Sequence, residues 1–256
     1  MWDPTIYKWF EKERARPFPD LLAHVRRKST RSIADLGCGP GKLTLRLAKR
    51  WPSAKVIGVD SSPQMLADAK ELAIPQRLKF AEADIATWSP AKPLDLLVSH
   101  AALQWVGDHE NVIPRLAGFL APGGTLAVQM PYRFGQTPAQ IAIEKTAGDP
   151  RWAAALKGVG LHQDSVQPLD WYVRCLLQMG FMVDAWQTTY CHILAGENPV
   201  LAWMMGTALR PLLERLQADL QDEFLQALGK RLMAAYPVEC GVTLFHFPRM
   251  FFVATR

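Results

Sequence analysis

Five short apolar runs alternate with helical stretches through the first half of the chain, and this alternation constrains the fold more than any other feature. The runs comprise residues 32–38, 55–60, 78–84, 94–100 and 125–130. Strands that are separated by helices form parallel sheets with helices on both faces. We therefore predict an α/β fold with a mainly parallel central sheet.

Helix and turn signals lie between the expected strands. One helix begins at the glycine-rich loop after the first strand, and another begins at residue 63, where Ser62 can cap the helix and Pro63 suits its first position. The sequence APGG at 121–124 predicts a turn that ends a helix before the fifth strand.

The alternation is looser after residue 130. We predict a helix at 170–180, a strand at 181–190, and a long helical stretch that starts at Asn198 and ends near Ala235. The last segment, 243–256, predicts a strand at the edge of the sheet. No convincing linker divides the chain, so we expect one domain over residues 1–256, with a helical insertion at 197–236 before the last strand.

The N-terminus predicts an amphipathic helix within residues 1–20. Asp3 can cap it and Pro4 follows, and apolar residues recur at roughly helical spacing, namely Trp2, Ile6, Trp9 and Phe10. We expect this helix either to close over the site as a lid or simply to pack on the core.

Composition excludes several classes of protein. The chain has 49% apolar and 21% charged residues, as globular proteins do, and no apolar run approaches the length of a membrane span. Its four cysteines form no CxxC pair and no metal-ligand spacing, which favours a cytoplasmic protein with free thiols and no metal. The net charge of +5 is scattered, and the short basic run at 24–31 reads as a solvated face, so we expect neither a nucleic-acid nor a membrane partner.

The loop DLGCGPGKLT at 35–44 has the glycines of a cofactor-binding turn. A phosphate-binding loop needs GxxxxGK followed by Ser or Thr, but Leu36 and Leu43 stand at those positions. A dinucleotide fingerprint needs GxGxxG, but the third glycine, Gly41, comes one place early. The loop therefore fits neither a nucleotide phosphate nor a dinucleotide.

Acidic residues end the next two strands, where open parallel sheets bind their ligands. Asp60 lies 19 residues after Gly41 and can accept hydrogen bonds from both ribose hydroxyls of an adenosine. Asp84 can accept from the adenine amino group, while Met65 and Ile85 flank the ring. Each acid alone is as well explained by a helix cap or a surface charge, but the three strand ends together indicate an adenosine cofactor.

These motifs resemble those of the class I S-adenosylmethionine-dependent methyltransferases, in DLGCGPG (35–41), VIGVDSS (56–62) and AEADI (81–85). The resemblance implies their Rossmann-like fold and S-adenosylmethionine as cofactor, with Asp35 near its methionyl amino end. The predicted cofactor-binding residues are Asp35, Gly37, Gly39, Gly41, Asp60, Ser61, Met65, Asp84, Ile85 and His100.

Further segments are similar to the trans-aconitate methyltransferases: 7–17, 100–109, 126–131, 186–194, 206–216 and 247–256. The resemblance spans nearly the whole chain. It implies methyl transfer to one carboxylate of a small polycarboxylic acid, which gives a monomethyl ester and S-adenosylhomocysteine.

A carboxylate is already ionised at neutral pH, so this reaction needs alignment in a dry site rather than a strong base. Arginines should neutralise the carboxylates that do not react, because a guanidinium fork suits them. The predicted substrate-binding residues are Tyr7, Arg16, Arg133, Tyr172, Arg210 and Arg249, and the predicted catalytic residues are Gln104, Trp105, Tyr190 and His192. Each arginine alone reads equally as a surface residue, and the aromatic residues and His192 read equally as core.

The chain also departs from this family. Tyr132 and Arg133 stand where the family has Asp-Asn, no histidine follows Pro138, and the stretch DWYVR (170–174) keeps Tyr172 but presents Arg174. We expect these changes to affect which acid is bound.

Three other functions compete with this interpretation. A malonyl-carrier-protein carboxyl methyltransferase shares the fold and chemistry, and a basic protein suits an acidic carrier. A non-catalytic protein that binds the same cofactor is a second alternative. A nucleic-acid amino-methyltransferase needs an Asn/Asp-Pro-Pro-aromatic motif after the fourth strand, where this chain reads SHAALQW.

Overall fold

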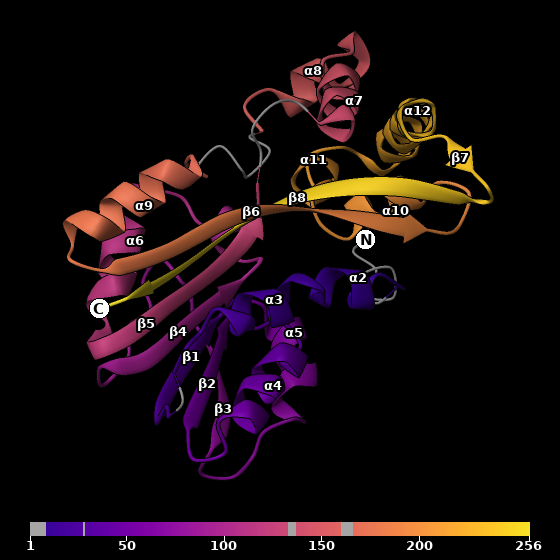
Figure 1. Ribbon diagram of the computed structural model, residues 1–256. Helices are drawn as coiled ribbons and strands as arrows, with labels where there is room; N and C mark the ends of the chain where they lie inside the picture. Colours follow the sequence, from indigo (N-terminus) through magenta and orange to yellow (C-terminus); the bar gives the residue numbers. More distant parts are fainter. Residues whose placement is uncertain (1–8, 28, 133–136, 160–165) are drawn as a thin grey trace. The chain divides into compact units, whose positions relative to one another are not determined.

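A computed structural model describes residues 9–27, 29–132, 137–159 and 166–256 of the chain (Figure 1). The chain divides into two compact units, each formed by three segments. Unit 1 comprises Met1–Arg14, Arg133–Asp164 and Thr189–Pro248, and unit 2 comprises Ala15–Tyr132, Ser165–Thr188 and Arg249–Arg256. The predicted insertion at 197–236 lies within unit 1.

The central sheet has the strand order β3-β2-β1-β4-β5-β8-β6. Its strands are β1 (Ser32–Leu36), β2 (Lys55–Asp60), β3 (Leu78–Glu82), β4 (Leu94–His100), β5 (Leu120–Pro131), β6 (Met182–Leu194) and β8 (Val242–Thr255). The first five pair in parallel, as predicted from the alternating runs, and β8 is antiparallel to β5. The prediction of an edge position for the last strand is wrong, because residues 249–255 pair with β5 and β6 takes the edge.

Helices cover both faces of the sheet in unit 2. Figure 1 shows α4 (Lys42–Arg50) and α5 (Pro63–Lys70) on one side of the parallel strands, and α6 (His109–Gly118) and α9 (Leu169–Gln178) on the other. The predicted cap of α5 is present, since the Ser62 side chain accepts a hydrogen bond from the backbone N–H of Met65. The larger apolar core of this unit lies on the side of α6 and α9.

The predicted turn at 121–124 is instead an irregularity within β5. Leu94 pairs with Leu120, and Leu96 pairs with Thr125. Between these two pairs the chain of β4 moves on by two residues, whereas that of β5 moves on by five. This is a β-bulge, which leaves extra residues unpaired while the strand continues. The glycines at 123 and 124 do not end the helix, because α6 already ends at Gly118.

Unit 1 is mainly helical. It contains α2 (Glu11–Ala15, which ends where unit 2 begins), α7 (Pro138–Ala147), α8 (Pro150–Leu156), α10 (Pro199–Met205), α11 (Arg210–Leu213), α12 (Ala218–Ala235) and β7 (Val238–Glu239). Its core is rich in large aromatic side chains, including Trp152, Trp203, Phe224 and Phe245.

The long helical stretch predicted from 198 to 235 consists of three helices. Asn198 caps the first as expected, since its side chain accepts from the N–H of Leu201. Gly206 follows the end of α10, and Pro211 lies in the first turn of α11. Glycine and proline both interrupt a helical run, and the apolar periodicity alone did not reveal these breaks.

The described part of the N-terminus contains α2 and α3 (Pro17–Ala23). Residues 1–8, with the predicted cap Asp3, lie outside the described residues. In the described ranges, no helix is both long enough and apolar enough to cross a membrane. The same ranges contain no cluster of three or more His, Cys, Asp or Glu side chains suited to a metal ion.

Candidate functional site

The glycine-rich loop joins the carboxyl end of β1 to α4. Gly37 and Gly39 have positive φ angles of 73° and 54°, a region that favours glycine. A Cβ at Gly37 would lie 2.1 Å from the Cβ of Ala102, whereas a Cβ at Gly39 would have no described atom within 4 Å other than those of Gly39 and its chain neighbours. Gly37 therefore permits close packing against the turn after β4, and Gly39 leaves open space above the strand ends.

Asp60 holds this loop from the end of β2. Its carboxylate accepts a hydrogen bond from the N–H of Gly39 at 2.8 Å and another from the N–H of Ser62 at 2.9 Å. The structure thus brings Asp60 and the glycines together. Each carboxylate oxygen has a further lone pair, so Asp60 can accept additional hydrogen bonds from a ligand.

Asp35 is a buried acid in β1 behind the loop. The hydroxyl of Thr44 donates to its carboxylate at 2.7 Å. Burial raises the pKa of Asp35 to about 6; the Thr44 hydrogen bond lowers it, and the nearby charge of Asp60 raises it. A positively charged group bound at the loop would favour the ionised form of Asp35.

The other predicted adenosine contacts lie around the same strand ends. Ile85 is buried, and its Cδ1 lies 3.6 Å from the position of a Cβ at Gly37. Asp84 is exposed, and its carboxylate accepts from the N–H of Ala86 at 2.7 Å. Met65, in the first turn of α5, is partly buried, and Ser61 is exposed before that helix.

The turn after β4 contains a left-handed residue, Ala101, with φ of 55°. Gln104 is buried, and its side-chain amide donates to the carbonyl oxygen of Ala101 at 2.7 Å. This bond assigns Gln104 a part in holding the turn. Trp105 lies in the following 3₁₀ helix, η1 (Leu103–Trp105), and its side chain is 41% exposed.

His100 and Arg249 lie on the same face of the sheet of unit 2. Burial, followed by the positive charge of Arg249, lowers the pKa of His100 to about 3, so its imidazole is neutral at physiological pH. Arg249 is buried in β8. Between their strands lies Gln129 of β5, which is also buried and which the sequence interpretation missed. Its one sequence signal is a lone amide inside the apolar run LAVQMP.

The structure places Tyr172, a predicted substrate-binding residue, in the core of unit 2. Its side chain is fully buried against the sheet, stacked on Phe252 at 5.0 Å. Its hydroxyl is hydrogen-bonded to Nδ1 of His109 at 2.5 Å and accepts from the N–H of Gln167 at 3.0 Å. Tyr172 therefore belongs to the core between α9 and the sheet, where its polar group is satisfied.

Three predicted residues belong to unit 1. Tyr190 and His192 are buried in β6, with their rings nearly parallel, and His192 stacks on Trp203 at 5.0 Å. Arg210 is exposed and forms an ion pair with Glu214, one turn further along the chain, at 3.6 Å.

The remaining predicted substrate residues are Arg16, Tyr7 and Arg133. Arg16 is exposed at the start of α3 in unit 2. Tyr7 and Arg133 lie outside the described residues.

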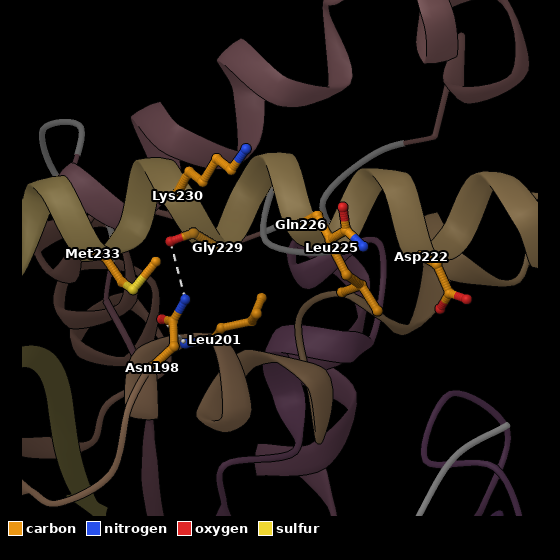
Figure 2. Close-up of a pocket in the computed structure, with 8 residues that line it drawn as sticks. All are labelled: Asn198, Leu201, Asp222, Leu225, Gln226, Gly229, Lys230 and Met233. Carbon is orange, nitrogen blue, oxygen red and sulfur yellow. Dashed lines mark hydrogen bonds between the residues drawn. The ribbon is translucent and has the colours of Figure 1, made fainter.

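A groove of about 490 Å³ lies between α10 and α12 in unit 1 (Figure 2). Leu201, Leu225 and Met233 supply its apolar lining, and Asn198 donates to the carbonyl oxygen of Gly229 at 3.0 Å across it. It contains none of the predicted site residues, so it is separate from the strand-end site.

Solved structures resemble this fold at low sequence identity. A Bacillus subtilis protein, YcgJ, has a TM-score of 0.62 and 12% identity, with 94% of this chain and 98% of that chain covered. The plantazolicin methyltransferase BpumL, solved with a triazolic desmethylPZN analog and SAH, has a TM-score of 0.54 and 15% identity, with 99% of this chain and 90% of that chain covered.

Sequence comparisons define the family. A family model described as a methyltransferase domain matches residues 33–124. A trans-aconitate 2-methyltransferase of Streptomyces avermitilis is 45% identical, covering 100% of this chain and 97% of the relative. One from Variovorax paradoxus is 43% identical with 100% and 98% covered, and one from Mycobacterium tuberculosis is 41% identical with 99% and 96% covered. With this identity over its full length, the chain belongs to the trans-aconitate 2-methyltransferase family.

Proposed function

We propose that this chain is an S-adenosylmethionine-dependent methyltransferase that forms a methyl ester on one carboxylate of a small polycarboxylic acid. The observation that carries this proposal is the full-length identity of 41–45% with trans-aconitate 2-methyltransferases. The names of those relatives make trans-aconitate, a tricarboxylic acid, the first acid to test.

The residues at the strand ends fit an adenosine cofactor with a cationic amino-acid tail. The open space at Gly39 admits a ligand close to the backbone, and Asp60 has spare lone pairs for ribose hydroxyls. The raised pKa of Asp35 is the property expected of a buried acid that gains a cationic partner on binding. The loop matches no phosphate-binding pattern, which favours a cofactor without a pyrophosphate.

Bound S-adenosylmethionine supplies an electrophilic methyl group, and its transfer to a carboxylate oxygen leaves S-adenosylhomocysteine. The chain's own task is to hold the acid. Because a carboxylate is ionised at neutral pH, no side chain has to remove a proton. With its pKa lowered to about 3, the imidazole of His100 is a weak base, which agrees with a site that works by binding and alignment rather than by acid–base catalysis.

Among the predicted acceptor residues, we assign the main charge-neutralising role to Arg249. It is buried in the same unit as the cofactor loop, and it lies on the same sheet face as Asp35 and His100. An arginine in a partly desolvated site binds a carboxylate more strongly than an exposed one. Arg16, Trp105, Tyr190, His192 and Arg210 stay predictions for the acceptor site, as do the lid at 1–20 and the cap at 197–236.

The test is methyl-ester formation from free acids. Purified protein would be incubated with methyl-labelled S-adenosylmethionine and with trans-aconitate, other di- and tricarboxylic acids, or a malonyl-loaded carrier protein. We expect base-labile label on a free polycarboxylic acid. Label on the malonyl carrier alone would favour the carrier-protein methyltransferase, and cofactor binding without transfer to any acceptor would favour a non-catalytic protein.

A further inference from the structure

Gln129 of β5 has a side-chain amide that no described residue satisfies. The residue is completely buried, and neither its Nε2 nor its Oε1 has a hydrogen-bond partner among the described residues. Native proteins rarely leave buried amides unpaired, and each exception needs an explanation such as a ligand or an ordered water. The amide therefore marks a place where a polar group is expected to bind.

A third unsatisfied polar atom belongs to the neighbouring strand. His100 of β4 pairs with Gln129 in register, so the two side chains lie on the same face of the sheet. Neighbouring strands in a sheet lie about 4.8 Å apart. The Nε2 atom of His100 is buried and also has no described hydrogen-bond partner. Three buried polar atoms thus belong to two side chains that are neighbours on one face of the sheet.

These two side chains lie at the carboxyl ends of parallel strands, in apolar surroundings. The ring of Phe18 meets the ring of His100 edge-on at 5.4 Å. On the other side, Gln129 pairs with Phe251 of β8, whose ring stacks on Trp186 at 4.7 Å. Aromatic walls exclude water, which strengthens hydrogen bonds to any ligand that enters.

The same face of the sheet carries the positive charge of Arg249, which favours the binding of an anion. Arg249 pairs with Pro131, two residues beyond Gln129 along β5, so its side chain points to the same face. An amide N–H₂ donates hydrogen bonds, and a neutral imidazole donates from one ring nitrogen, which for a carboxylate here must be Nε2. An arginine supplies the positive charge. Hydrogen-bond donors on the same face as a buried arginine are the groups that a carboxylate needs.

We propose that Gln129 and His100 bind a carboxylate of the acceptor acid that is not methylated, on the sheet face that carries Arg249. This assigns His100, which the sequence predicted as a cofactor-binding residue, to the acceptor instead. The cofactor also has a carboxylate, in its methionyl part. The acceptor is favoured because β5 is separated by β4 from β1, the strand that leads into the cofactor loop. This inference deepens the proposed function and rests on it.

The test replaces Gln129 with Met, which keeps the length of the side chain and removes its hydrogen bonds, and with Glu, which places a negative charge at the site. The matched control is Gln178→Met, at an exposed position at the end of α9 in the same unit. Three quantities would be measured for each variant: KM and kcat with trans-aconitate, the Kd of S-adenosylhomocysteine, and the thermal midpoint.

We expect Gln129→Met to raise the KM for trans-aconitate by roughly ten-fold to a hundred-fold, and Gln129→Glu to raise it at least as much, while the Kd of S-adenosylhomocysteine changes less than two-fold. Calorimetric binding of trans-aconitate to the complex with S-adenosylhomocysteine should weaken in parallel, which keeps the test valid even for a variant with low turnover. Gln178→Met should behave as the parent.

Other outcomes overturn the inference. Unchanged kinetics in a folded Gln129→Met variant would mean that the amide only holds a water. A selective loss of S-adenosylhomocysteine affinity would assign it to the methionyl carboxylate. If the parent methylates acids but Gln129 variants match it, only this inference fails; if the parent neither binds nor methylates any acid, the proposed function fails first.

Discussion

At the scale of single residues, the candidate site is built from buried polar groups that a ligand would complete. Asp35 illustrates this, because its carboxyl is buried, and burial is the largest influence on its raised pKa. A buried acid whose ionisation is disfavoured weakens the fold at neutral pH but suits a cationic ligand. The effect of Asp35 on the stability of the ligand-free protein and its effect on cofactor binding can be measured separately.

We predict that Asp35→Asn stabilises the ligand-free protein at pH 7.5. The pKa of Asp35 rises from 3.8 to about 6 on folding, so the fold favours the protonated form. The stability linked to this group is therefore fully present below about pH 4 and is lost as the pH rises through about 6. The loss in free energy of unfolding amounts to at most about 3 kcal/mol. Asn does not titrate and can still accept from Thr44.

Thermal unfolding from pH 4 to pH 8 measures this effect. The midpoint of Asp35→Asn should exceed that of the parent at pH 7.5, and the difference should shrink towards pH 4. The same variant should bind S-adenosylmethionine more weakly. A difference that does not depend on pH would contradict the assigned cause.

We predict that Asp60→Ala weakens the binding of S-adenosylhomocysteine by roughly 1.5 to 3 kcal/mol, because it removes a charged acceptor and frees the Gly39 end of the loop. Isothermal calorimetry measures the change, and Asp170→Ala, at an exposed position on α9, is the control. Parent-like affinity in a folded Asp60→Ala protein would remove Asp60 from the cofactor site.

The sequence predicted where the expected cofactor residues lie in the fold better than where the expected acceptor residues lie, for a physical reason. Asp60 and the glycines lie at ends of adjacent parallel strands, so their positions follow from the strand pattern. Gln129 and Tyr172 could not be assigned in this way. Whether a side chain in an apolar segment is satisfied depends on its neighbours across the sheet, such as His109 for Tyr172.

At the scale of elements, the loop after β1 and the turn after β4 form one packed structure. Gly37 meets Ala102 in that turn, and Gln104 holds the left-handed Ala101. The sequence predicted most strands and helices because their periodicity is local. It missed the bulge in β5 and the breaks between α10, α11 and α12, where short glycine and proline signals compete with a continuing apolar pattern.

Two alanine substitutions distinguish the roles of the glycines in this loop. Gly37→Ala should lower the thermal midpoint strongly, since its Cβ would overlap Ala102 and its φ is positive. Gly39→Ala has the strain of a positive φ but open space, so it should cost less stability, about 1 kcal/mol. It should mainly reduce S-adenosylhomocysteine affinity. Equal loss of stability in both variants would contradict this distinction.

At the scale of the whole molecule, β8 and β6 extend the parallel sheet of unit 2, and both strands also contain residues of unit 1. Residues 249–255 of β8 pair with β5 in unit 2, while its residues 242–243 pair with β7 in unit 1. The sequence could not place β8 beside β5, because strand order across a sheet depends on contacts distant along the chain. The chain thus returns Arg249 to the sheet face that carries Asp35.

Ligand-dependent stability tests the class of cofactor for the intact chain. S-adenosylhomocysteine at 100 times its Kd should stabilise the protein by about 2.7 kcal/mol, visible as a raised midpoint. NAD and ATP should leave the midpoint unchanged, because the loop lacks both phosphate-binding patterns. Strong stabilisation by NAD would contradict the methyltransferase assignment.

The most direct test of the account is the ratio of kcat/KM for trans-aconitate to kcat/KM for a monocarboxylic analogue, measured in the parent, Arg249→Gln and Arg249→Lys. The control is Arg46→Gln, at an exposed position on α4. We predict that the parent and control strongly prefer the tricarboxylic acid, that Arg249→Gln reduces the ratio by roughly ten-fold to a hundred-fold, and that Lys restores it only in part. An undiminished ratio in Arg249→Gln, or no ester from any free acid, would contradict the account.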